Sequence, residues 1–258
     1  MAWDPPVSRR LSEFLAAAGP ATVAAFDADG TLWSRDVGDA FLQHAGQSGF
    51  LKAFPKGDAV WTEYQRRMAT GDLPYAFELC VTAFEGLTNA EVTAFAEAFV
   101  APAWNAYVFP AMRSLIDGLH RAEADVWVVS ASPIWCVVPG AALLGIPGHR
   151  VIATQPSVVD GMVMGTLGAP LPAFDGKVTS LLARAHRGAH FAAGNTEYDF
   201  ALLESARVLA LLVNPPAGDA WLTRKNGDKW LVQRFEEPVV EAEKAAKKKR
   251  ASKRGTVR

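Results

Sequence analysis

The sequence predicts an α/β fold in which a mainly parallel sheet is flanked by helices and a small all-helical domain is inserted after the first strand. Two observations lead to this prediction. In the second half of the chain, short apolar runs of strand length alternate with segments of helical periodicity, as in repeated βα units. Directly after the first apolar run, by contrast, residues 36–101 show helical periodicity without an intervening strand pattern.

The N-terminal part is predicted to hold one helix and then the first strand. Around residues 9–18, Glu13 interrupts an apolar stretch that is too short for a secretion signal, so an amphipathic helix is expected there. The β-prone run 22–26 is the first strand. Apolar positions spaced three and four residues apart then predict helices over 36–50, 58–70, 74–87 and 89–101. Thr88 and Glu91 have the spacing of a capping box before the last of these helices.

The rest of the chain is predicted to alternate between strands and helices. The predicted strands are 125–130, 150–154, 189–193 and 207–213, and the predicted helices are 111–121, 133–144, 176–187 and 198–205. Asp160-Gly161, between the short apolar runs 157–159 and 162–164, predicts a β-hairpin. Because the strands are continuously apolar, we expect helices to cover both faces of a parallel sheet.

Composition is typical of a soluble globular protein, because half of the residues are hydrophobic and no apolar run approaches the roughly 18 residues of a membrane span. Cys80 and Cys136 lie far apart without metal-ligand spacing, which is typical of buried thiols, so a cytoplasmic location is expected. Residues 244–258 hold eight Lys or Arg and no acidic residue, which predicts a solvated, disordered tail over 236–258. Contact of this tail with nucleic acid or anionic lipid is the alternative.

The pair Asp27 and Asp29 is the first candidate for chemistry. It follows the first strand directly and leads into a Gly30-Thr31 turn. Residues two apart in a strand face the same side, and open α/β sheets bind their ligands at the carboxyl ends of the strands. Two carboxylates held so close repel each other unless a cation or a shared proton lies between them. An ordinary structural turn is the alternative interpretation of this pair taken alone.

Polar residues also follow other predicted strands or begin predicted helices. Ser130 ends the strand 125–130 and precedes a helix with Pro133 in its first turn, an arrangement suited to binding an anion. Lys177 begins a helix after a Gly residue, and residues 194–199, Gly-Asn-Thr-Glu-Tyr-Asp, follow the strand 189–193. Each of these signals is weak by itself, because such residues are common at the ends of ordinary helices and strands.

In this order, the four segments resemble the motifs of the haloacid dehalogenase superfamily of phosphohydrolases over roughly residues 22–215. The helical insertion resembles the C1-type cap of the phosphoserine-phosphatase-like branch. The resemblance implies a Rossmann-like core formed by residues 1–33 and 105–235, with a cap at 34–104. It also implies an Mg²⁺-dependent phosphomonoesterase that hydrolyses a small phosphorylated metabolite.

The resemblance further implies a role for each matching residue. Asp27 would be the nucleophile that forms an aspartyl-phosphate, and Asp29 would be the general acid and base. The phosphate-binding residues would be Gly30, Thr31, Ser130 and Lys177, and the metal would be bound by Asp27, the Asp29 carbonyl, Asn195 and Asp199. Asn195 stands where the family has an aspartate, which implies weaker metal binding. Asp199 is then either a ligand or a supporting partner.

The substrate is less determined by the sequence. Asp36 matches the position at which phosphoserine phosphatases hold the amine of serine, and Trp33 lies near it, so both are candidate substrate contacts. The arginine that holds the serine carboxylate in that branch has its counterpart near Cys80, and a thiol cannot form the same paired hydrogen bonds. Arg66 and Arg67 are the alternative partners for a carboxylate. A phosphocholine-like or phosphoethanolamine-like substrate is one hypothesis, and a phosphoserine-like substrate is the other.

Three other functions stay open at this point. One is a phosphotransferase that passes the phosphoryl group to an alcohol. Another, motivated by Asn195, is a catalytically weakened protein that binds a phosphorylated metabolite. The third is an adaptor that acts through the basic tail.

Overall fold

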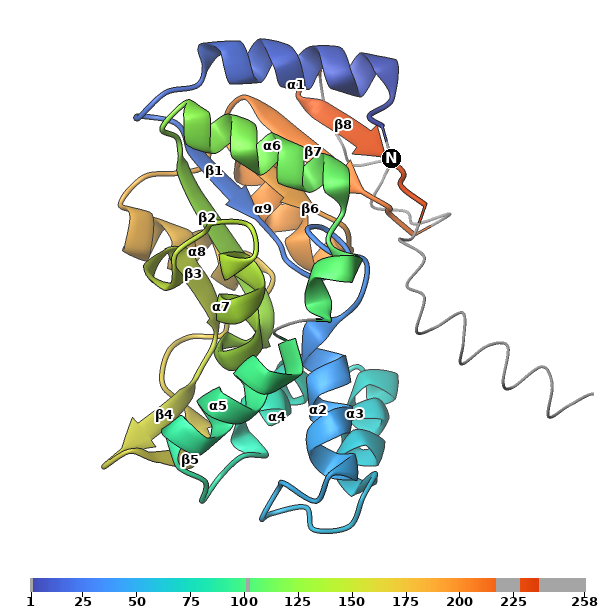
Figure 1. Ribbon diagram of the computed structural model, residues 1–258, viewed down its shortest axis with the longest axis vertical. Helices are drawn as coiled ribbons and strands as arrows, with labels where there is room; N and C mark the ends of the chain where they lie inside the picture. Colours follow the sequence, from blue (N-terminus) through green and yellow to red (C-terminus); the bar gives the residue numbers. More distant parts are fainter. Residues whose placement is uncertain (1, 101–102, 217–227, 237–258) are drawn as a thin grey trace, which may run out of the picture.

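A six-stranded parallel sheet forms the centre of the computed structural model (Figure 1). The structure describes residues 2–100, 103–216 and 228–236. The strands are β1 (Val23–Phe26), β2 (Asp125–Pro133), β3 (Val151–Thr154), β6 (Phe191–Gly194), β7 (Leu209–Val213) and β8 (Trp230–Gln233). Their order in the sheet is β3-β2-β1-β6-β7-β8, which places β1 between β2 and β6. The loops that follow these three strands therefore meet at one edge of the sheet.

Helices cover both faces of this sheet. They are α1 (Pro5–Ala17), α6 (Pro110–Arg121), α7 (Ile134–Ala142), α8 (Asp175–Ala185) and α9 (Phe200–Ser205). Phe26 and Val128 pack on the side of α1, α6 and α7, whereas their neighbours Ala25 and Val129 pack on the side of α8 and α9. Because both faces are buried, the strands show the continuous apolar pattern from which a parallel sheet was expected.

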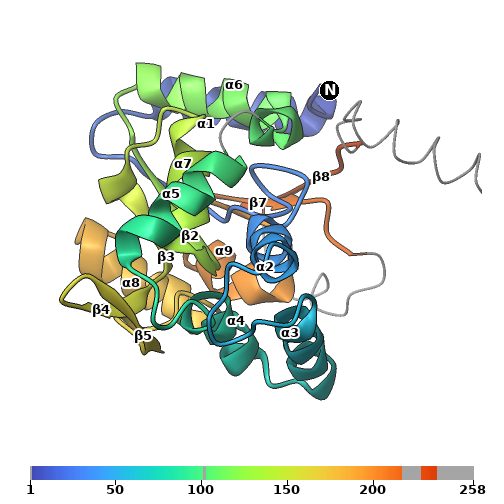
Figure 2. The ribbon, with the colours of Figure 1, turned by 60° about the horizontal axis from the view of Figure 1, so that its bottom comes forward.

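The helical insertion after β1 contains α2 (Val37–Gln47), α3 (Ala59–Thr70), α4 (Leu73–Thr82) and α5 (Asn89–Val100), and a 3-10 turn, η1 (Trp104–Tyr107), leads from it towards α6. In Figure 2, α2, α3 and α4 lie together and α5 lies beside α7. Aromatic rings fill the interior of the insertion. Phe41 stacks on Phe84 with ring centroids 5.2 Å apart, and Phe50 stacks on Phe95 at 3.9 Å.

A β-hairpin from the second half of the chain packs against the insertion. Its strands are β4 (Pro156–Val159) and β5 (Met162–Leu167), and short 3-10 turns, η2 (Gly148–Arg150) and η3 (Glu197–Asp199), lie before β3 and before α9. The Val163 amide donates to the Leu87 carbonyl, and the Gly86 amide donates to the Val163 carbonyl. These backbone hydrogen bonds attach the hairpin to the α4–α5 connection.

Most of the predicted elements are confirmed within a few residues, and the Thr88–Glu91 capping box is present. Two predictions are corrected. The second strand does not end at Ser130 but continues to Pro133, because a register shift between these residues keeps β2 paired with β3. Strand β8 was not predicted, because its four residues have no surrounding periodic pattern and pairing with β7 makes them a strand. The predicted basic tail lies outside the described residues.

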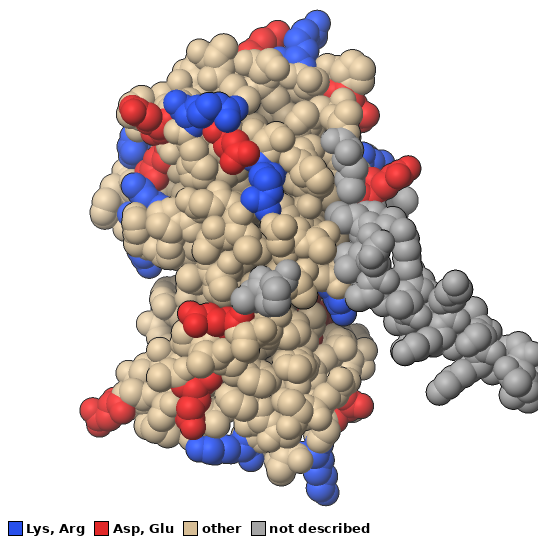
Figure 3. Space-filling model, in the orientation of Figure 1, with Lys and Arg blue, Asp and Glu red and all other residues tan. Residues whose placement is uncertain are grey.

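On the described part of the face in Figure 3, acidic and basic side chains are interspersed. No broad patch of one sign covers that face, so its charges do not mark a binding surface for a strongly charged macromolecule. Among the described residues, no helix combines the length and the apolar character that a membrane crossing requires.

The hairpin turn gives a prediction about stability. Asp160 and Gly161 have φ values of 49° and 78°, as a type I′ turn requires. A Cβ at Gly161 would meet no atom within 4 Å, so Gly161→Ala tests the backbone conformation alone. We expect this substitution to lower the free energy of unfolding by about 1–2 kcal/mol, measured by urea denaturation.

Gly19→Ala is the matched control for this prediction. Gly19 also has open space around its Cα, but its φ is not positive, so alanine there should be neutral or slightly stabilising. Equal effects of the two substitutions would contradict the assigned turn.

Candidate active site

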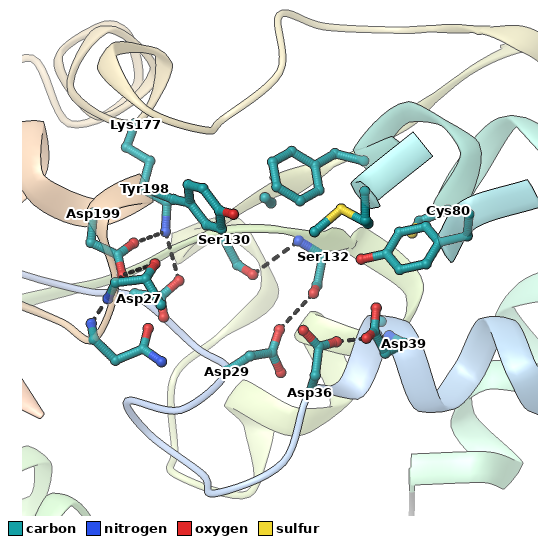
Figure 4. Close-up of a pocket in the computed structure, with 17 residues that line it drawn as sticks. Asp27, Asp29, Asp36, Asp39, Cys80, Ser130, Ser132, Lys177, Tyr198 and Asp199 are labelled. Carbon is teal, nitrogen blue, oxygen red and sulfur yellow. Dashed lines mark hydrogen bonds and ion pairs between the residues drawn. The ribbon is translucent and has the colours of Figure 1, made fainter. Parts of the chain in front are cut away.

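The loops after β1 and β6, the C-terminal end of β2 and the first turn of α8 surround a cavity of about 190 Å³. Helices α2, α3 and α4 of the insertion close it from the other side (Figure 4). The sequence-predicted residues that line it are Asp27, Asp29, Asp36, Ser130, Lys177, Asn195 and Asp199. Residues far apart in the chain therefore meet where the sequence predicted a ligand site.

Asp27 is a buried carboxylate of the cavity wall and is only 6% exposed. Its backbone amide donates to the Ala193 carbonyl of β6, which fixes the loop directly after β1. One carboxylate oxygen accepts a hydrogen bond from Lys177 Nζ at 2.6 Å, and the other accepts one from Thr31 Oγ1 at 3.0 Å. Thr31 is fully buried, so in this structure it holds Asp27 and does not line the cavity.

Lys177 joins Asp27 to Asp199. Its Nζ lies 2.5 Å from Asp199 Oδ1, and the lysine side chain is 1% exposed. The second oxygen of Asp199 accepts hydrogen bonds from the backbone amides of Asn195 and Thr196, at 3.0 and 3.1 Å. Burial alone would lower the pKa of Lys177, but the charges of Asp199 and Asp27 raise it above its usual value. Lys177 is therefore a permanent cation between two acids.

Asp29 is held in one orientation by three donors. Trp33 Nε1 and the Val37 amide donate to one oxygen at 2.6 and 2.7 Å, and Ser132 Oγ donates to the other at 2.5 Å. Ser132 was not among the predicted site residues. It lies two residues after Ser130, so the same alternation that pairs Asp27 with Asp29 could have indicated it.

Both acids after β1 hold their protons more tightly than ordinary aspartates. Burial, followed by the charge of Asp199, raises the pKa of Asp27 from its usual 3.8 to about 7, against the opposing effect of Lys177. Burial, followed by the charge of Asp36, raises the pKa of Asp29 to about 7, while the bonds from Ser132, Val37 and Trp33 lower it. Such pKa values suit groups that exchange protons near neutral pH.

Ser130 offers an unused donor to the cavity. The residue is 1% exposed, and its Oγ accepts a hydrogen bond from the Ser132 amide at 3.1 Å. Among the hydrogen bonds of the described residues, none is donated by this hydroxyl. A buried hydroxyl in that state is suited to an oxygen of a ligand.

Gly30 allows the loops after β1 and β6 to touch. Its φ is +74°, and a Cβ at this position would lie 2.0 Å from the Nδ2 atom of Asn195. Only glycine fits this close approach. The side chain of Asn195 is thereby placed against the turn that carries Asp29.

Oxygen donors for a hard cation are present at this contact. Among the described residues, no group of three or more His, Cys, Asp and Glu could hold a metal ion. The available set is mixed and consists of the Asp27 carboxylate, the Asn195 amide and the Asp29 carbonyl, which accepts none of the backbone hydrogen bonds of the turn 27–33. Carboxylate, amide and carbonyl oxygens are the donors that Mg²⁺ prefers, so the residues fit this ion.

The expected substrate contact by Trp33 is corrected. The indole is fully buried, packs against Gly140 and does not line the cavity. Its Nε1 donates to Asp29, which makes Trp33 a positioning residue. Asp39, which lines the cavity beside Asp36, was missed, although residues three apart on a helix share a face.

The raised pKa of Asp27 predicts how stability depends on pH when no divalent cation is present. Unfolded Asp27 loses its proton near pH 3.8 and the folded group near pH 7, so rising pH between these values favours the unfolded state. Asparagine does not titrate, so as the pH rises through this range the free energy of unfolding of Asp27→Asn should increase relative to that of the unsubstituted protein by at most about 4 kcal/mol, in addition to the pH-independent cost of the lost ion pair. Urea denaturation in a chelating buffer at about pH 4 and about pH 8 measures the difference. A difference that does not change with pH would contradict the raised pKa.

Comparison with known proteins gives the site its context. The family model described as haloacid dehalogenase-like hydrolase matches residues 24–204. A solved protein of unknown function from Bordetella pertussis Tohama I aligns with a TM-score of 0.70 at 21% identity, covering 82% of this chain and 97% of that one. A substrate-bound phosphoserine phosphatase aligns with a TM-score of 0.55 at 15% identity, covering 87% and 97%.

A phospho-aspartyl intermediate analogue of phosphoserine phosphatase aligns with a TM-score of 0.54 at 16% identity, covering 87% of this chain and 98% of that one. The search of curated proteins gave no match. The structural neighbours share the fold, and the family model spans all the strand-end residues that line the cavity. The chain therefore belongs to the haloacid dehalogenase-like hydrolase family.

Proposed function

We propose that the chain is an Mg²⁺-dependent phosphomonoesterase that acts on a small substrate through a phosphorylated Asp27. The observation that carries the proposal is that Asp27 and Asp29 lie in one cavity with different partners. A lysine and a threonine hold Asp27, whereas three neutral donors hold Asp29. This difference suits one carboxylate to attack and the other to transfer protons.

In the proposed reaction, an oxygen of ionised Asp27 forms a bond to phosphorus while the bond from phosphorus to the ester oxygen breaks. Protonated Asp29 donates its proton to that oxygen, and the alcohol leaves neutral. Asp29 then accepts a proton from the water that attacks phosphorus, and phosphate leaves as Asp27 is regenerated. A pKa of about 7 supports both roles of Asp29, because it can then donate and accept near neutral pH.

The phosphoryl oxygens are proposed to be bound by the Ser130 hydroxyl and by Lys177. The Gly30 amide, which the resemblance also implied, donates instead to the Trp33 carbonyl at 2.8 Å, and Gly30 does not line the cavity. Lys177 and Ser130 lie beside Asp27 in Figure 4. Lys177 also favours the ionised form of Asp27, which is the form that attacks. We assign Thr31 to holding Asp27, since it is buried and bonded to that carboxylate.

The Asp27 carboxylate, the Asn195 side-chain oxygen and the Asp29 carbonyl are proposed to hold Mg²⁺. Bound there, the ion would neutralise charge on Asp27 and on the phosphoryl oxygens, which is the main demand of phosphoryl transfer. Of the two roles left open for Asp199, we propose the supporting one, because Lys177 and two backbone amides occupy its oxygens.

A second candidate function is binding of a phosphorylated metabolite without efficient turnover. The observation in its favour is Asn195, which supplies an amide where a carboxylate would hold the cation more strongly. The hydrolase stays the first candidate, because the chain shares its fold with a phosphoserine phosphatase that was solved as a phospho-aspartyl intermediate analogue.

We expect the protein to hydrolyse p-nitrophenyl phosphate with Mg²⁺ and to lose this activity in a chelating buffer. Asp27→Asn should reduce kcat by about 10³-fold or more, because a neutral amide cannot serve as the nucleophile. Asp58→Asn, an exposed substitution on the insertion outside the cavity lining, is the control and should keep full activity. Mass spectrometry after rapid acid quenching should find one added phosphoryl group on the peptide that contains Asp27. Turnover that survives Asp27→Asn would falsify the assigned nucleophile.

Asn195→Asp tests the proposed cation ligand. The added negative charge should lower the Mg²⁺ concentration for half-maximal activity about tenfold, since ligand charge sets the affinity of such sites. Asn195→Asp should also lower Tm in a chelating buffer, because it adds a negative charge beside Asp27. The rise in Tm on adding Mg²⁺ should be larger than in the unsubstituted protein. Asn195→Ala is the comparison and should weaken Mg²⁺ binding. An unchanged response of Tm to Mg²⁺ in both variants would remove Asn195 from the site.

A further inference from the structure

The cavity continues from the proposed phosphate site towards the helical insertion, where the alcohol part of a substrate must lie. Its lining there consists of Asp36, Gly38 and Asp39 from the start of α2, Tyr64 and Met68 from α3, Phe77 and Cys80 from α4, and Tyr198 from the core. Figure 4 shows Asp39 and Cys80 on the side away from Lys177 and Asp199. The chemistry of this second end selects the alcohol, if the proposed function holds.

The second end offers no cation to a substrate. Among the described residues that line the cavity, Lys177 is the only Lys or Arg, and its Nζ is already bonded to Asp27 and Asp199. Arg66 and Arg67 do not line the cavity, although the sequence left them as alternatives. Both form ion pairs with Glu63 on their own helix. A carboxylate on the substrate would therefore meet negative charge without a compensating partner.

Two carboxylates instead face this end. Asp36 caps α2, its Oδ1 accepting a hydrogen bond from the Asp39 amide at 2.7 Å, and it is exposed to solvent at the cavity mouth. The negative charge of Asp39 lies close to it. Burial raises the pKa of Asp39 to about 6, against a hydrogen bond from the Tyr64 hydroxyl. A cation placed between these acids would relieve their repulsion.

Aromatic rings and a neutral thiol form the remaining wall. The rings of Phe77 and Tyr198 meet edge to face with centroids 5.7 Å apart, and Tyr64 is 6% exposed. Burial raises the pKa of the Cys80 thiol, so that it stays neutral. Aromatic faces attract organic cations, which adds to the effect of the carboxylates.

We propose that the substrate is the phosphomonoester of a small amino alcohol, with an organic cation a few bonds from the phosphate and no carboxylate. Asp36 and Asp39 are the specificity-determining residues, and they face the cation. The cavity of about 190 Å³ is smaller than the roughly 300–1,000 Å³ of pockets for drug-sized ligands, which favours a small alcohol. This proposal rests on the proposed function, because it assumes that the phosphate binds at Asp27.

The test compares kcat/KM of the Mg²⁺-loaded protein for four phosphomonoesters of similar length. They are phosphoethanolamine, phosphocholine, the neutral 2-hydroxyethyl phosphate and phosphoserine. We expect the better of the two cationic esters to exceed the neutral ester and phosphoserine by about tenfold or more, since hydrogen bonds and ion pairs with a charged group discriminate by at least this factor. Preference for phosphoethanolamine indicates that the carboxylates dominate, and preference for phosphocholine indicates that the aromatic wall dominates. Either result supports the proposal.

Asp39→Asn and Asp36→Asn should each lower the ratio of kcat/KM between the preferred cationic ester and the neutral ester by about tenfold. Asparagine caps a helix as well as aspartate does, so Asp36→Asn keeps the start of α2. Asp58→Asn is the matched control and should leave the ratio unchanged. Circular dichroism confirms that each variant is folded.

The outcomes separate this proposal from the proposed function. Three results would overturn the amino-alcohol proposal while leaving the phosphatase intact. They are equal kcat/KM values for all four esters, a preference for phosphoserine or the neutral ester, and a ratio of kcat/KM that neither Asp36→Asn nor Asp39→Asn changes. Failure to hydrolyse p-nitrophenyl phosphate as well as the four esters would instead overturn the proposed function.

Discussion

The buried ion pairs of Lys177 with Asp27 and Asp199 are the interaction on which the site depends. They join the end of β1, the first turn of α8 and the loop after β6, which are far apart in the chain. Removing one partner from such a network leaves a buried charge uncompensated, at a cost of about 3–5 kcal/mol. The same contacts keep the Asp27 carboxylate buried in the cavity wall, and Lys177 offsets only part of its negative charge. Stability and reactivity at Asp27 are therefore set by the same three charged groups.

Asp29 links this centre to the helical insertion. Its carboxylate accepts a hydrogen bond from the Val37 amide at the first turn of α2 and another from Ser132 in β2. Ser132 in turn lies against Gly38, where a Cβ would be 2.7 Å from the serine Oγ. The first turn of α2 is thereby packed onto the loop that carries the acid. The proposed substrate contacts of the insertion and the proposed proton-transferring Asp29 are therefore connected through packed residues.

The two ends of the cavity differ in charge, because Lys177, the one Lys or Arg among the described residues that line it, lies at the end of Asp27. At one end Lys177 lies between two acids, so it can contact an anion that displaces part of its present bonding. At the other end the acids of α2 have no basic partner among the residues that line the cavity. Lys177 and the proposed Mg²⁺ at one end, and the acids of α2 at the other, favour a dipolar ligand in a single orientation. The proposed function requires phosphate at the Lys177 end, because this orientation brings phosphorus to Asp27.

The sequence by itself determined the sheet, the helical insertion and the identity of the residues at the strand ends. Apolar strands such as β1 and β7 and the turn at Asp160-Gly161 could be predicted because their patterns are local. Strand β8 could not, because four residues after a gap in the pattern become a strand only by pairing with β7. The extension of β2 beyond Ser130 likewise depends on its pairing with β3.

Within the site, the sequence determined which residue types stand at each strand end, and the tertiary structure decided what each of them contacts. Trp33 and Thr31 point into the protein to hold Asp29 and Asp27, because their side chains are buried between packed layers that no local pattern reveals. Asp39 and Ser132 follow known periodicities, yet only the packing of α2 against β2 brings them to the cavity. The electrostatic character of the site was also decided in three dimensions, since a pKa depends on burial and on charges that are distant in sequence.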